Sequence, residues 1–252
     1  MNIVLIGNSK NKFTLTILRE FLKSNIDVKA CIFIDHGYKY NLYLFKTVLK
    51  KIGFYGTVIS SLIRFKNQIA QPSFKSLEKQ IDFESNNIKQ LKVRGANSIQ
   101  MQDLLESMEV DLLVLGNTGI IKKNILTIPS IGTLNAHPGI LPEYKGLDSI
   151  YWASYHKEFE NMGVTVHFVD EGIDTGNIIS KTYVNFENEK NISKAYRKLL
   201  RLSSKVLADA ALKIIDNKNL KTISNENGNY FSKIPIKKYL KAKKYFKNSG
   251  EK

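Results

Sequence analysis

The sequence of 252 residues has a single cysteine, Cys31. One thiol excludes an intramolecular disulfide and a cysteine-ligated metal cluster, so we expect a protein of a reducing, cytoplasmic setting without a metal. No stretch approaches the roughly 18 uninterrupted apolar residues that a membrane-spanning helix needs. The N-terminus also lacks the charged leader and apolar core of an export signal. These absences predict a soluble chain with no membrane partner.

Two further motifs are missing. The apolar run that ends at Ile6 is not followed by the Gly-x-Gly spacing of dinucleotide-binding folds, which disfavours a nicotinamide-dependent oxidoreductase. Three of the four histidines, His36, His156 and His167, have no ligand-like spacing to one another. Structural roles are predicted for these three residues.

The chain is short of acidic residues, since 38 lysines and arginines face 23 aspartates and glutamates. This excess attracts anionic partners such as phosphates and nucleotides, although scattered lysines are equally compatible with a lysine-rich surface. No nucleic-acid partner is expected, and a homodimer is left open. One cluster near the C-terminus is predicted to be a solvated tail in preference to a basic helix: Lys237, Lys238, Lys241, Lys243, Lys244 and Lys247.

The pattern of apolar residues predicts an α/β fold. Residues 2–7 and 28–35 are continuous apolar runs typical of buried parallel strands, and residues 13–23 between them have helical spacing. This β-α-β order indicates an open, twisted, mostly parallel sheet with helices on both faces. The segment 38–92 is predicted to contain helices at 42–53 and 59–69 and an irregular connection.

The rest of the chain continues the alternation of strands and helices. Strands are predicted at 111–116, 132–137, 163–169 and 178–184, helices at 99–108, 149–158 and 191–217, and an extended segment at 228–231. We therefore expect a catalytic domain over residues 1–184. Residues 185–252 are predicted to form a C-terminal helix and a short basic extension packed on it.

Two short segments carry polar residues suited to chemistry. Asn135 and His137 are two positions apart on one strand, so both side chains project to the same side of it, and Pro138 ends the strand there. By itself this pattern is more typical of a core histidine or a strand cap. Asp174 follows a later strand in a glycine-flanked acidic loop, and in isolation an Asp-Thr-Gly sequence indicates a turn.

Taken together, the segments resemble the folate-dependent formyltransferases. The resemblance rests on the sequence from Asn135 to Pro142, on Lys145-Gly146, and on residues 163–169 with Asp174-Thr175-Gly176. It implies that Asn135, His137 and Asp174 are catalytic and that N10-formyltetrahydrofolate is the donor. It also implies that two loops form a pocket for the pterin ring: Gly116, Asn117, Thr118, Gly119, Val169, Asp170, Glu171, Gly172 and Asp174. This chain departs from some relatives at Asp170 and Gly172.

Elementary chemistry agrees with these implied roles. Charge builds on the formyl oxygen when an amine attacks, and the Asn135 amide can donate a hydrogen bond to that oxygen. His137 can stabilise the same charge or move the proton from the amine, and a carboxylate at Asp174 favours the protonated imidazole.

The acceptor is predicted to be the amine of a nucleotide-linked amino sugar, a precursor of lipopolysaccharide O-antigen or a similar surface polysaccharide. The chain is longer than the purine-pathway enzymes of the family and shorter than the methionyl-tRNA enzymes. Candidate contacts are Asn8 and Lys10 in a loop that resembles a phosphate loop, and Tyr144, Lys145 and Asp148, which are alternatively ordinary loop residues. Phosphoribosylglycinamide formyltransferase and a folate-dependent formyl hydrolase are the alternatives.

Overall fold

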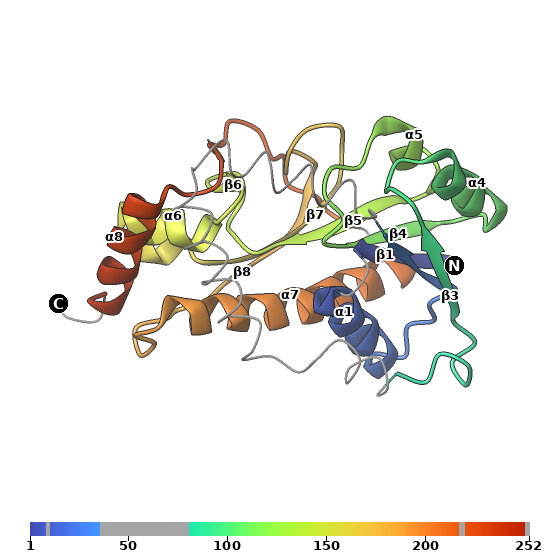
Figure 1. Cartoon of the computed structure of the whole chain (residues 1–252), viewed down its shortest axis with the longest axis horizontal. Helices are drawn as coiled ribbons and strands as arrows, with labels where there is room; N and C mark the ends of the chain where they lie inside the picture. Colours follow the sequence, from blue (N-terminus) through green and yellow to red (C-terminus); the bar gives the residue numbers. More distant parts are fainter. Residues whose placement is uncertain (9–10, 36–80, 217–219, 250–252) are drawn as a thin grey trace.

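The computed structural model describes residues 1–8, 11–35, 81–216 and 220–249 (Figure 1). Within these residues, one mixed sheet of seven strands has the order β3-β2-β1-β4-β5-β7-β8. Its strands are β1 (Ile3–Asn8), β2 (Ala30–Ile34), β3 (Lys89–Val93), β4 (Leu112–Gly116), β5 (Gly132–His137), β7 (Gly163–Phe168) and β8 (Ile178–Tyr183). A small second sheet pairs β6 (Lys145–Gly146) with β9 (Tyr230–Phe231).

Helices cover both faces of the large sheet. They are α1 (Lys12–Lys23), α4 (Ile99–Ser107), α5 (Lys123–Leu126), α6 (Ser149–His156), α7 (Ile192–Ile215) and α8 (Ile236–Lys247), with a 3₁₀ turn η1 (Phe159–Asn161). In Figure 1, α1 and α7 lie below the sheet, whereas α4 and α5 lie above its right-hand end. The predicted fold class, a mostly parallel α/β sheet with helices on both faces, is confirmed.

Alternation along the strands divides the core into two layers. Ile3 and Leu5 of β1 pack in one cluster with α1 and α7, and Val4 and Ile6 pack in the other with α4. Every residue of β2 and β4 is buried, because both strands are covered on both sides. The continuous apolar runs of the sequence follow directly from this burial.

Two strands depart from the sequence predictions. β3 forms the edge of the sheet, in a segment for which only helices and a connection were predicted, because an edge strand can expose Lys89, Gln90 and Lys92 to water and shows no apolar run. The helices predicted at 42–53 and 59–69 lie outside the described residues. β7 runs antiparallel to β5, which the sequence did not reveal.

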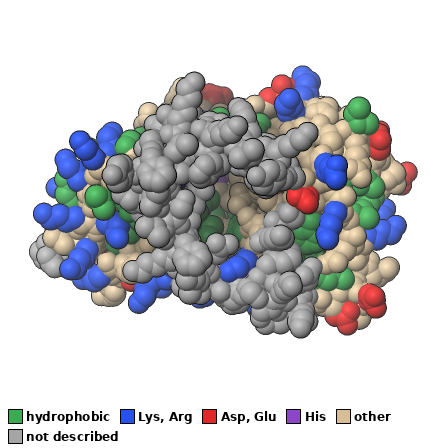
Figure 2. Space-filling model, in the orientation of Figure 1, with side chains coloured by type: hydrophobic (Ala, Val, Ile, Leu, Met, Phe, Trp, Pro, Cys, Tyr) green, Lys and Arg blue, Asp and Glu red, His purple; other side chains and the backbone are tan. Residues whose placement is uncertain are grey.

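The C-terminal lysines belong to a helix, so the preferred prediction of a solvated tail is wrong. Helix α8 buries Ala242 and Phe246 and packs beside α6 at the left of Figure 1. Lys238 lies over the Trp152 ring, with its Nζ atom 4.8 Å from the ring centroid. Figure 2 shows lysine and arginine side chains gathered at this end of the molecule. Of the described helices, none is long and apolar enough to cross a bilayer.

Helix α1 closely approaches the carboxyl ends of strands β1 and β4. The buried Thr14 hydroxyl donates a hydrogen bond of 2.8 Å to the carbonyl of Gly116, at the carboxyl end of β4. A Cβ atom on Gly7 would lie 2.0 Å from the Thr14 hydroxyl oxygen. Glycine at this position therefore lets the helix approach the strand ends that border the candidate site.

We expect Thr14→Val to lower the free energy of unfolding by about 1–3 kcal/mol, because the carbonyl of Gly116 loses its buried donor while side-chain volume hardly changes. The matched control is Thr16→Val in the same helix, where the hydroxyl only donates to the helical carbonyl of Lys12. Urea unfolding measures both changes. Equal losses in the two variants would contradict a special role for the bond between the helix and the strand.

Candidate active site

A cavity of about 1030 Å³ opens at the carboxyl ends of the parallel strands. Its walls are the loops that follow β4, β5 and β7, together with one face each of α1 and α7. In open α/β sheets ligands bind at this edge, where loops converge on the strand ends. The size and position of the cavity make it the candidate active site.

Asn135 and His137 of β5 both line this cavity, as the period of the strand predicts. Asn135 lies opposite His167 of the antiparallel strand β7. The distance from Asn135 Nδ2 to His167 Nε2 is 3.2 Å, a hydrogen bond across the strand pair. The amide group is therefore held by a neighbouring strand rather than free to rotate.

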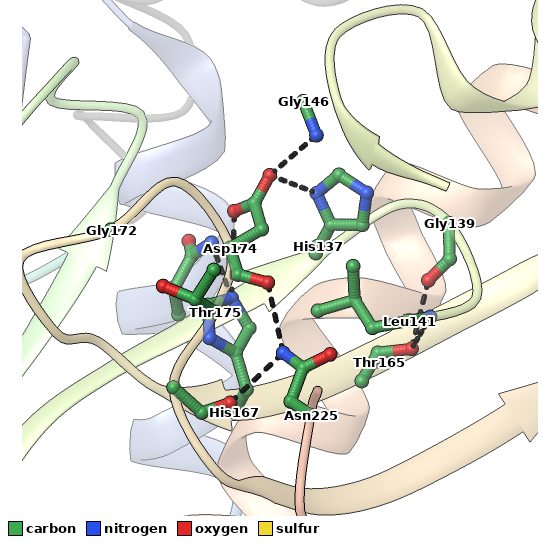
Figure 3. A network of polar contacts seen from close by, with 12 residues as sticks. His137, Gly139, Leu141, Gly146, Thr165, His167, Gly172, Asp174, Thr175 and Asn225 are labelled. Carbon is green, nitrogen blue, oxygen red and sulfur yellow. Dashed lines mark hydrogen bonds and ion pairs between the residues drawn. The ribbon is translucent and has the colours of Figure 1, made fainter. Parts of the chain in front are cut away.

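Asp174 reaches His137 only because the loop after β7 folds back. Since β7 is antiparallel to β5, the chain leaves β7 at the end of the sheet away from His137. The loop returns and its carboxylate oxygen Oδ2 accepts a hydrogen bond of 2.8 Å from the backbone amide of Gly146 (Figure 3). Asn225 anchors the same loop by donating to the carbonyl oxygens of Asp174 at 2.8 Å and Gly176 at 3.0 Å.

His137 lies between two oxygen acceptors. Its Nδ1 atom is 3.3 Å from Oδ2 of Asp174, and its Nε2 atom is 2.8 Å from the carbonyl oxygen of Tyr144. The hydroxyl of Ser149 is 3.0 Å from Nε2. Each ring nitrogen therefore faces an oxygen atom, and these contacts hold the imidazole in one orientation.

His167 is a neutral hydrogen-bond acceptor in the same cluster. Its Nδ1 atom is 2.6 Å from the carbonyl of Phe168 and must donate to it, which leaves Nε2 to accept from the Asn135 amide. Burial, the largest effect, lowers the pKa of His167. His167 Nε2 also lies 3.7 Å from Oδ1 of Asp174. The structural role predicted for His167 stays a prediction, and the side chain also lines the cavity.

The loops that the sequence proposed for the pterin ring meet at the cavity with two exceptions. Seven of the nine predicted residues line it: Asn117, Thr118, Gly119, Val169, Asp170, Gly172 and Asp174. Gly116 instead lies beneath, against Thr14, and the Glu171 carboxylate forms an ion pair of 2.9 Å with Lys123. Neither Gly116 nor Glu171 is part of the cavity wall.

Of the predicted acceptor contacts, only Asp148 lines the cavity. Asn8 is not part of the wall, and Lys10 lies outside the described residues. Tyr144 and Lys145 are 2% and 6% exposed and turn away from it. The structure therefore does not bring these two side chains to a bound sugar.

Tyr144 and Lys145 support the site from outside the cavity. Lys145 Nζ donates to the carbonyl of Asn225 at 2.8 Å, and the Tyr144 hydroxyl donates to the Glu158 carboxylate at 2.8 Å. Lys145 thereby fixes the segment whose Asn225 side chain anchors the Asp174 loop. Sequence reasoning missed Asn225, which carries no local signal because its partners lie 49 and 51 residues earlier in the chain.

Across the described ranges, with their gaps at 9–10 and 36–80, no group of three or more His, Cys, Asp or Glu side chains could hold a metal ion. The polar cluster consists of an amide, an imidazole and a carboxylate beside a cavity. This combination suits transfer of an acyl-type group, because it offers a donor for a developing oxyanion and a proton carrier. The fold is of the α/β class, with this polar cavity at the carboxyl ends of its parallel strands.

Comparison with known proteins places the chain in a family. Residues 46–211 match the family model described as formyl transferase, and the chain belongs to this family. The methionyl-tRNA formyltransferase of Clostridioides difficile is 33% identical over 152 residues, which are 60% of this chain and 48% of that protein. The chain thus spans about half the length of this curated relative.

Solved structures share the fold. The N-formyltransferase of Helicobacter canadensis, in complex with folinic acid and dTDP-3-aminofucose, aligns with a TM-score of 0.61 at 19% identity over 98% of this chain and 80% of that one. The glycinamide ribonucleotide transformylase 1 of Symbiobacterium toebii aligns with a TM-score of 0.60 at 18% identity, covering 90% of this chain and 94% of that one.

The lowered pKa of His167 predicts acid-sensitive stability. Because the unfolded chain takes up this proton at a higher pH than the folded chain, stability falls as the pH drops below about 6.5, by at most about 1.4 kcal/mol per pH unit. His167→Gln keeps an acceptor for Asn135 and has no titrating ring, so the loss of stability at acid pH should be smaller. Urea unfolding at several pH values measures it, and an identical pH profile for the variant would contradict the assignment.

Removing the Asn225 amide should loosen the Asp174 loop. Asn225→Asp replaces the two donated hydrogen bonds by repulsion between its carboxylate and the two carbonyl oxygens, and we expect it to cost about 2 kcal/mol or more in unfolding free energy. The control is Asn185→Asp, an exposed asparagine whose side chain only accepts from a nearby backbone amide. Unfolding midpoints compare the two, and a neutral Asn225→Asp would contradict the anchoring role.

Proposed function

We propose that this chain transfers the formyl group of N10-formyltetrahydrofolate to the primary amine of a nucleotide-linked amino sugar. The observation that carries the proposal is the position of His137, held between Asp174 and the carbonyl of Tyr144 at the wall of a cavity that Asn135 also lines. Membership of the formyl transferase family supports the reaction class.

Asn135 acts as the donor to the formyl oxygen. Its Nδ2 group carries two hydrogens, and the acceptor His167 Nε2 takes one of them. The second hydrogen is left for the oxygen on which charge builds as the amine attacks, and its orientation is set before the substrate arrives. A preorganised donor of this kind contributes several kcal/mol to lowering the barrier.

His137 and Asp174 together accept and return the proton of the attacking amine. His137 can stabilise the developing negative charge or move the proton of the attacking amine, and the Asp174 carboxylate holds its ring through Nδ1. Asp174 is oriented in turn by the Gly146 amide, so its oxygen cannot swing away from the ring. As the new carbon–nitrogen bond forms, the amine would lose a proton to the His137–Asp174 pair; the bond from the formyl carbon to N10 of the folate would then break, and that proton would pass to N10 so that tetrahydrofolate leaves.

The residues of the cavity fit a reduced folate. Apolar residues line it from the end of β4 and from both loops, namely Leu115, Ile121, Val169 and Ile173, beside the segments 117–119 and 169–172. A flat heterocycle with several donors and acceptors suits such a slot. The bound formyl folate would supply an already activated formyl group, which is why no metal is called for.

The charge of the cavity wall supports an acceptor with phosphate groups, a property that the amino sugar shares with the alternative acceptors. Proteins that resemble this chain are named for three different acceptors: methionyl-tRNA, glycinamide ribonucleotide and an amino sugar carried by dTDP. The cavity wall formed by α1 and α7 presents several basic side chains, which suit an acceptor with phosphate groups. A panel assay separates the three acceptors directly.

In this assay, purified protein and N10-formyltetrahydrofolate are incubated with nucleotide-linked 3-amino and 4-amino sugars, with glycinamide ribonucleotide or with methionyl-tRNA. We expect formylated product, detected by mass spectrometry, only with an amino sugar. Product from glycinamide ribonucleotide or methionyl-tRNA alone would refute the sugar acceptor. Formate released without any amine would instead identify a hydrolase.

Replacing the donor amide should slow turnover strongly without unfolding the chain. We expect Asn135→Asp to lower kcat by about 10²–10³, since an oxygen that cannot donate replaces Nδ2. Asn124→Asp, an identical change on helix α5 outside this cavity, serves as the control. Steady-state kinetics and circular dichroism are the measurements, and a folded Asn135→Asp variant with full activity would end the assignment.

A further inference from the structure

The charges on the cavity wall are separated by sign. Among the described residues of the wall, the four lysines and arginines come from α1 and α7: Lys12, Arg19, Arg197 and Arg201. The three aspartates there come from the loops on the sheet edge: Asp148, Asp170 and Asp174. The cavity therefore has a cationic side and an anionic side, although it is one continuous space.

Helical spacing accounts for the cationic side. On α7, Tyr196, Arg197, Leu200 and Arg201 occupy one face, one turn apart. On α1, Lys12, Thr16 and Arg19 likewise share one face, and the two helices pack against each other. Residues far apart in the chain thus place their guanidinium groups on a common wall.

Among the described residues, the ion pairing of these arginines is sparse. Arg197 and Arg201 are like charges at i and i+4, an arrangement that disfavours the helix unless an anion offsets it. Within the described segments, no ion pair includes either of them. The Nε atom of Arg19 is buried and has no hydrogen-bond partner among the described residues, with Glu20 Oε1 3.6 Å away.

We infer that Arg19, Arg197 and Arg201 bind the diphosphate of the acceptor. A diphosphate carries two or more negative charges and many acceptor oxygens, which match several guanidinium forks better than one carboxylate does. Binding it on the helix wall directs the sugar amine toward the opposite, anionic side, where His137 and Asp174 lie. The inference rests on the proposed function and adds the part of the acceptor that is recognised and the side of the cavity that it occupies.

The competing anion is the glutamate tail of the folate, and the two sources are separable. We compare wild type with the double variant Arg197→Gln/Arg201→Gln and with a charge-matched control, Lys194→Gln/Lys205→Gln. Both control lysines are exposed on α7 and lie outside the cavity wall. Calorimetry with dTDP and UDP, and with dTMP and UMP, measures binding without any turnover.

We expect wild type to bind the diphosphates about 10-fold or more tightly than the monophosphates, and the arginine variant to lose this preference while the lysine control keeps it. The acceptor KM should rise about 10- to 100-fold in the arginine variant, with the KM of the formyl folate within about twofold. Arg19→Gln should weaken diphosphate binding in the same direction.

Three results would overturn the inference: equal affinity of wild type for diphosphates and monophosphates, no loss of affinity in the arginine variants, or a rise confined to the KM of the folate. Failure of the proposed function gives a different pattern. In that case the arginine-dependent preference for a diphosphate persists in calorimetry, while no nucleotide-linked amino sugar is formylated.

Discussion

The site depends on one contact, between the carboxylate of Asp174 and the ring of His137. The antiparallel strand β7 carries the chain away from His137, so the contact exists only because the following loop folds back over the strand ends. The Gly146 amide and the Asn225 side chain hold this loop from opposite sides. A buried lysine then holds the segment that contains Asn225. These hydrogen bonds together fix the position of the Asp174 carboxylate.

The histidine pair shows how burial and hydrogen bonding give two identical side chains different states. His167 donates to its neighbour's carbonyl and is left as a neutral acceptor, which fixes the Asn135 amide with its nitrogen toward the ring. His137 faces oxygen atoms through both nitrogens. One ring thus accepts from the Asn135 amide while the other is held between two oxygens, and the difference follows from which atoms surround each ring.

The cavity brings together surfaces of opposite charge. Loops at the sheet edge contribute carboxylates near His137, and two helices contribute guanidinium groups on the facing wall. An acceptor that carries an amine at one end and phosphates at the other can satisfy both sides at once. This distribution of charge is set by the particular side chains of α1, α7 and the loops at the sheet edge.

The sequence by itself determined the α/β class and most elements of the sheet, because parallel strands buried on both faces leave continuous apolar runs. It also determined that Asn135 and His137 share a face, since side chains alternate along a strand. Only the tertiary structure decided that β3 and the antiparallel β7 belong to the sheet, that His167 and Asn225 join the site, and that Tyr144 and Lys145 lie behind it. The physical reason is that strand direction, loop return and burial depend on partners distant in the chain, which local periodicity does not record.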